Sequence, residues 1–112
     1  MMLHRLPTQG ERQRAILDNL IQDKGLRPGQ YALFFVSGEG AYLPIDSTDQ
    51  PVEETSGFVV DNQERVFSFW LGWDEAGRRP ALLEWEQVDP EPGWSQSAEY
   101  RAARQMIGLH AA

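Results

Sequence analysis

Residues 58–88 decide the fold, and they read FVVDNQERVFSFWLGWDEAGRRPALLEWEQV. Aromatic and branched residues alternate with other residues along three segments, and two short polar segments separate these from one another. This alternation predicts two successive antiparallel hairpins. If residues 62–63 form the first turn, Phe58 lies opposite Phe67, and extending the loop by one residue on each side keeps the same partners.

The second hairpin follows from a turn over residues 74–80. Setting Trp73 opposite Ala81 makes Leu71 face Leu83 and Phe69 face Trp85. Side chains on one face of a sheet come from every second residue of a strand, so the pairing also defines a core face. The residues expected on that face, in contact with the first helix, are Phe58, Phe67, Phe69, Leu71, Leu83 and Trp85.

The segments before the hairpins predict one helix and two more strands. Thr8 and Glu11 have the spacing of a capping box, and apolar residues then recur at helical spacing as far as Gly25. The run Tyr31–Ser37 is apolar on both faces, which favours a central strand covered on each side. Residues 41–45 can return as the next strand.

The remaining segments complete the expected fold. Residues 46–56 are polar and predict an exposed loop, and Ser95 or Ser97 can begin a last helix. The order is helix, five strands, helix, which predicts a single α+β domain (residues 1–112) with an antiparallel sheet. Residues 1–7 and 110–112 are expected to be flexible tails.

Charge and composition exclude several classes of protein. The net charge of this 112-residue chain is −7, and residues 46–91 hold twelve acids against three bases, which gives −9. Such a surface repels phosphate, so we expect no nucleic-acid partner. No segment has the length and hydrophobicity of a membrane span, and the absence of cysteine excludes disulfides and cysteine metal sites. The expected location is the cytoplasm.

Patterns that would indicate catalysis have simpler explanations. The two histidines, His4 and His110, lie beside the termini, where they are poor candidates for a general base. The acids between residues 46 and 54 do not match a calcium loop, because Pro51 stands where glycine is required. Acids at the two predicted turns suit backbone hydrogen bonding. We therefore expect no enzyme activity, no metal and no cofactor.

The tryptophans give the only indication of a binding surface. Trp73 and Trp85 fall on the predicted core face, and Trp94 is expected to pack at the entry of the last helix. Trp70 falls on the opposite face among carboxylates, which suits a partner that carries arginine or lysine. The candidate binding residues are Ser68, Trp70, Leu82, Glu84 and Glu86. If a helix covers this face, however, they are simply the second side of the core.

Two functions from different classes fit these features. The first is a non-catalytic interaction module that uses the acidic, aromatic sheet face to bind a basic protein or a second copy of itself. The second is a small-molecule binder or minor enzyme with a pocket between sheet and helix, where Tyr31, Tyr42 or Tyr100 supplies a polar group. A flat open face favours the first and a deep pocket favours the second.

Overall fold

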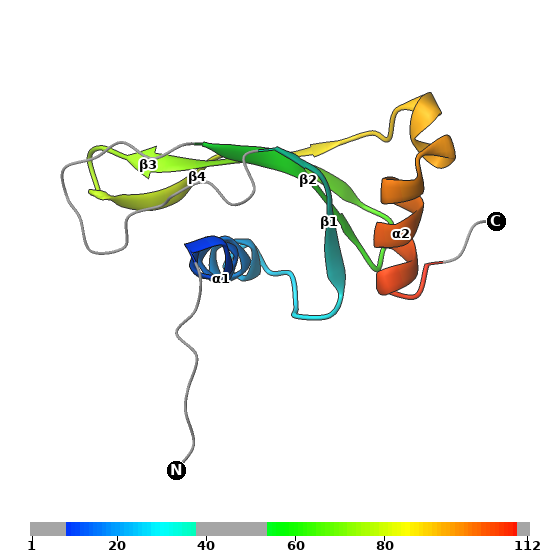
Figure 1. The fold of residues 1–112 in the computed structure, drawn as a ribbon, viewed down its shortest axis with the longest axis horizontal. Coiled ribbons are helices and arrows are strands. Elements are labelled where there is room, and N and C mark those ends of the chain that lie inside the picture. Colours follow the sequence, from blue (N-terminus) through cyan, green and yellow to red (C-terminus); the bar gives the residue numbers. More distant parts are fainter. Residues whose placement is uncertain (1–8, 38–53, 110–112) are drawn as a thin grey trace, which may run out of the picture.

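A computed structural model of the chain describes residues 9–37 and 54–109. In this part, four antiparallel strands form one sheet in the order β1-β2-β3-β4, with two α-helices and one short 3-10 helix (Figure 1). The elements are α1 (Gln9–Gln22), β1 (Tyr31–Ser37), β2 (Thr55–Asp61), β3 (Val66–Asp74), β4 (Arg79–Val88), η1 (Pro92–Gln96) and α2 (Ala98–Met106). The α+β class and the antiparallel sheet are confirmed. The predicted strand 41–45 and both predicted tails lie outside the described residues.

Helix α1 packs on one face of the sheet because its apolar residues recur on one side. Leu17 and Ile21 are buried there at 2% and 0% exposure, in a cluster with Phe69 and Leu71 of β3. The side chain of Gln13 donates to the hydroxyl of Thr55, which ties the helix to β2 through a buried polar contact. We call this side of the sheet the α1 face.

The opposite side, the α2 face, has its own core. Phe34 is fully buried there, with Trp94 from η1 and Tyr100 from α2 packed against its ring at centroid distances of 5.2 and 4.9 Å. Ser97 caps the N-terminus of α2, and its hydroxyl accepts from the amide of Tyr100 at 3.4 Å. The prediction that Trp94 packs at the entry of this helix is thereby confirmed.

Strand β1 has apolar residues on both faces because it contributes to both cores. Within the described sheet, it lies at the edge and not at the centre. Its register shifts between Phe34 and Ser37, where Phe35 has a left-handed backbone with φ of 51°. The shift lets both phenylalanines join the α2 face, and the carboxylate of Glu99 accepts from the Phe35 amide at 2.9 Å. Helix α2 therefore stabilises the irregular part of β1 through this hydrogen bond.

The predicted pairing of β2 with β3 is wrong by one residue. Phe58 pairs with Ser68 and Val59 with Phe67, because the turn contains three residues, 62–64. The third of these, Glu64, takes a left-handed backbone with φ of 63°, which is the geometry of a three-residue hairpin loop. Phe58 consequently lies on the α2 face, stacked on Phe34 at 5.5 Å, and not on the α1 face.

The predicted pairing of β3 with β4 is correct only for part of the hairpin. Phe69 does pair with Trp85, but a bulge follows, and Leu71 pairs with Leu82 instead of Leu83. Leu83 is the extra residue, and 44% of it is exposed, so it does not belong to the core on the α1 face. The predicted pair of Trp73 with Ala81 is likewise wrong, because Trp73 pairs with Pro80.

Candidate functional site

The uncovered part of the α2 face carries the residues with the clearest capacity to bind a partner. Trp70 lies at its centre, and cross-strand pairing places Ser56 on one side of it and Glu84 on the other. Glu86 pairs with Ser68 in the next row. We define the Trp70 face as the residues Glu54, Ser56, Ser68, Trp70, Leu83, Glu84 and Glu86.

The described helices leave this surface open. Helix α2 and η1 pack over the part of the sheet next to the β2–β3 turn, where Val60 and Val66 are buried. Farther along β3, 38% of Trp70 is exposed, and the hairpin β3–β4 extends away from α2 (Figure 1). Trp70 would be part of the core if a helix of the same chain covered it. Neither described helix does so.

Four of the five predicted binding residues share this face. Ser68, Trp70, Glu84 and Glu86 project from the same side of the hairpin. Leu82 does not, because the bulge turns it to the α1 face, where it packs against the core of α1. The prediction of Leu82 as a member of this surface is therefore wrong.

Three members of the face, Glu54, Ser56 and Leu83, were not among the residues predicted from the sequence; Ser56 joins it as the β2 partner of Trp70. Leu83 lies over Gly72, so closely that a Cβ on Gly72 would come within 2.6 Å of the Leu83 side chain. Glu54 lies beside it, since its Cγ would be 3.5 Å from the same Cβ. The run of three apolar residues 81–83 interrupts the alternation of β4, and this was the available signal of a bulge.

The electrostatics of the Trp70 face are those of an acidic surface. Glu54, Glu84 and Glu86 are all exposed. In the part of the chain that the structure describes, the ion pairs of arginine involve Asp18, Asp61 and Glu64, not these three glutamates. The sequence of residues 38–53 contains four acids and no base. Two exposed apolar side chains thus lie among three carboxylates.

A second polar feature lies on the α1 face. The hydroxyl of Tyr31 donates to Asp18 at 2.7 Å and accepts from the side-chain amide of Gln22 at 3.3 Å. Burial, assisted by the hydrogen bond and charge of Asp18, raises the pKa of Tyr31 to about 12. Because its pKa is this high, the phenol stays protonated at neutral pH and is a poor general base. Tyr42, His4 and His110 lie outside the described residues.

The described residues provide no metal centre or membrane span. Within residues 9–37 and 54–109, no group of three or more His, Asp or Glu side chains is placed to hold a metal ion. Neither α-helix in these ranges combines the length and the hydrophobicity needed to cross a bilayer.

Comparisons with known proteins give no relative from which a function could be transferred. Searches against protein-family models, curated proteins and solved structures find no significant match for this chain.

Proposed function

We propose that this protein is a non-catalytic interaction module that binds a basic, extended protein segment on the Trp70 face. The observation that carries the proposal is the exposure of Trp70, at 38%, directly across from Glu84 on the neighbouring strand. An arginine or lysine of the partner can stack on the indole ring and pair with the adjacent carboxylate, two contacts that reinforce one another.

The rest of the face supports the same partner. Leu83, with 44% of its surface exposed, supplies a second apolar contact beside Trp70. Glu54 and Glu86 place further negative charge at the margin, where it increases the rate of association with a cationic partner. Exposed tryptophan near the centre of a patch is typical of positions that dominate binding energy.

A second copy of this chain is a less suitable partner. Residues 46–91 carry a net charge of −9, so two such surfaces repel each other. Strand β4 lies at the edge of the described sheet, and it carries Pro80, the Leu83 bulge and two outward glutamates. These are the features by which edge strands avoid pairing with another edge. The negative charge favours a basic partner over a second copy, and the features of β4 disfavour strand pairing between two copies.

The proposal can be tested with a labelled peptide of about ten residues, the length of an ordinary long strand, in which arginine alternates with valine. Trp70→Ala and Glu84→Lys should each weaken binding about tenfold, as measured by fluorescence anisotropy at low salt. The free energy of unfolding in urea should stay within about 1 kcal/mol of the parent value, because both residues are at the surface.

Matched controls distinguish an effect of the Trp70 face from an effect of net charge. Glu91→Lys makes the same charge change at an exposed residue before η1, and Met106→Ala removes an exposed apolar side chain of α2. Both should bind like the parent protein. A peptide with glutamate in place of arginine should not bind. Equal loss in Glu84→Lys and Glu91→Lys would contradict the proposal, and a stable dimer in sedimentation would favour self-association.

A further inference from the structure

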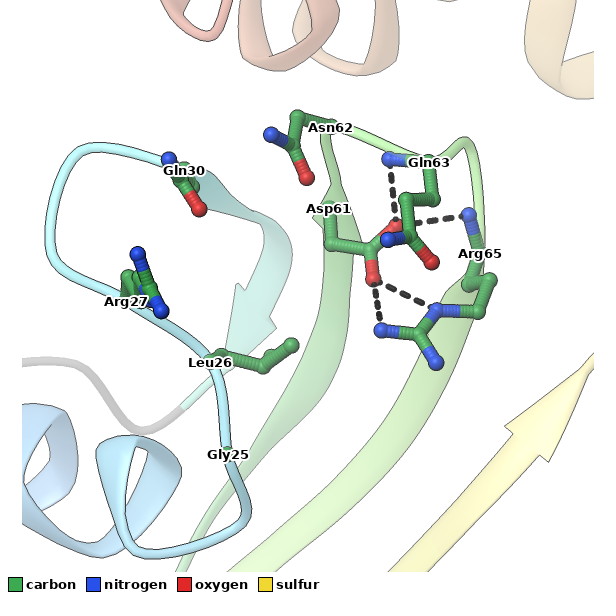
Figure 2. A pocket seen from close by; sticks show the side chains of 8 residues that line it. All are labelled: Gly25, Leu26, Arg27, Gln30, Asp61, Asn62, Gln63 and Arg65. Atoms are coloured by element: carbon green, nitrogen blue, oxygen red, sulfur yellow. Dashed lines mark hydrogen bonds and ion pairs between the residues drawn. The ribbon is translucent and has the colours of Figure 1, made fainter.

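A small polar pocket lies away from the Trp70 face, between the segment that joins α1 to β1 and the β2–β3 turn (Figure 2). Residues 25–30 form one wall and residues 61–65 the other, around a volume of about 250 Å³. The backbone amide of Asn62 donates to the backbone carbonyl of Gln30 at 3.0 Å, and this hydrogen bond connects the two walls. Sites for drug-sized ligands measure roughly 300–1,000 Å³, so this pocket suits a smaller molecule.

Asp61 organises one side of the pocket. Its side chain is 1% exposed, and one of its oxygens accepts the amides of Gln63 and Arg65 at 3.0 and 2.9 Å. The other oxygen accepts Nε and Nη2 of Arg65, both at 2.7 Å (Figure 2). The guanidinium also lies 5.5 Å from the ring centroid of Phe67. Arg65 is therefore held in one orientation, and its Nη1 is not used by Asp61.

The charge of the pocket is positive. Arg27 lines the opposite wall, and its guanidinium has no carboxylate partner among the described residues. Asp61 offsets Arg65, so Arg27 leaves the lining with a formal charge of +1, in a chain of net charge −7. The side-chain amides of Gln30, Asn62 and Gln63 provide further donors around the same volume (Figure 2).

We infer that this pocket binds a small oxyanion, a carboxylate or phosphate group, between Arg27 and the oriented Arg65. A guanidinium is suited to this role because it offers several donors in a fixed planar fork. Asp61 acts as a positioning residue. Its carboxylate accepts the hydrogen bonds that orient Arg65 and donates none to the anion. The site is independent of the proposed partner-binding role, because it uses none of the residues of the Trp70 face.

The test is a titration of the full ¹⁵N-labelled chain, followed by NMR, with inorganic phosphate and separately with succinate. Sodium chloride at matched ionic strength serves as the reference. The expected result is a saturable shift of the Asn62 and Gln63 side-chain amides and of the Arg65 Nε–H with at least one of the two anions. The arm that saturates at lower concentration identifies the preferred group.

Two arginine variants decide the assignment. Arg27→Ala should weaken the apparent affinity about tenfold, the loss expected for a charged hydrogen bond. Arg101→Ala removes the same charge from the exposed surface of α2 and should leave the affinity unchanged, as should Trp70→Ala. Equal losses in Arg27→Ala and Arg101→Ala, or shifts no larger than those with chloride, would overturn the inference. Loss of the shifts in Trp70→Ala would overturn the independence of the two sites.

Discussion

At the scale of single residues, a few backbone conformations decide which side chains reach which face. Glu64 and Arg78 both have positive φ, at 63° and 51°, near the ends of the two hairpin turns. Such a backbone is uncommon outside glycine and asparagine. Glu64 is stabilised from outside the turn, because its carboxylate pairs with Arg104 of α2 at 2.7 Å, and this pair raises the pKa of Arg104. The conformation of one turn thus depends partly on a distant helix.

A prediction at the residue scale concerns Tyr31. Its pKa is raised to about 12 by burial, from an ordinary value of 10.0. The folded state therefore holds this proton more tightly than the unfolded state between about pH 10 and pH 12, so stability is present below pH 10 and is lost as pH rises through this window. Tyr31→Phe removes the titrating group. The difference in free energy of unfolding between parent and variant should fall over that window.

The measurement is urea denaturation at a series of pH values from about 8 to 12. Asp18 and Gln22 hydrogen-bond the hydroxyl, and Arg14 acts on it through its charge. All three remain in both proteins, so the comparison isolates the phenol. A parent-minus-variant difference that stays constant across the window would contradict the raised pKa.

At the scale of elements, two glycines illustrate how close the strands lie to their neighbours. Gly57 of β2 is buried, and a Cβ there would lie 3.1 Å from the Val36 backbone and 3.2 Å from the ring of Phe69. The Val36 atom belongs to the backbone of β1 and the Phe69 ring is 1% exposed, so Gly57→Ala should destabilise the fold by about 1–3 kcal/mol, the usual cost of overpacking. Urea denaturation measures this cost.

Gly72→Ala is the matched comparison in β3. The added Cβ would lie too close only to the end of the exposed Leu83 side chain, which can rotate aside, while Glu54 Cγ at 3.5 Å is an ordinary contact. Stability should stay within about 1 kcal/mol of the parent value, while displacement of Leu83 should weaken binding of the arginine peptide. If Gly72→Ala proves as destabilising as Gly57→Ala, the Leu83 side chain is not free to rotate aside.

At the scale of the whole molecule, the two faces of the sheet are packed differently. The α1 face holds the larger aliphatic core, while the α2 face is divided between an aromatic core under α2 and the open Trp70 face. The positive pocket and the acidic face consist of different residues, so the proposed cationic partner and the inferred anion would not compete for the same atoms.

We also expect the folding of the whole chain to be independent of metal ions, because the sequence contains no ligand set with suitable spacing. Thermal unfolding curves recorded by circular dichroism with and without a chelator should superimpose. A melting temperature that falls on addition of the chelator, and recovers on addition of a divalent metal, would show that this expectation is wrong.

Much of the fold could be predicted because the relevant signals are local. Helical spacing and the serine cap predicted the two helices, and alternation predicted the strands of both hairpins. The pairing of Trp70 with Glu84 and of Phe69 with Trp85 also followed from alternation. These properties depend on neighbours along the chain, so composition and spacing were sufficient.

Tertiary structure decided the strand register near the turns and which side chains belong to the Trp70 face. A three-residue turn at residues 62–64 moved Phe58 to the other face, and the bulge exchanged the positions of Leu82 and Leu83. One added residue reverses every side chain beyond it, because strand periodicity is two. The sequence by itself determined the two helices, most of the strands of both hairpins and where the charge lies. The expected exposed loop 46–56 was wrong at its end, because Thr55 and Ser56 begin β2 and Thr55 is buried against Gln13 of α1. Only packing against α1 and α2 selected which face each strand presents, because that choice depends on contacts between distant residues.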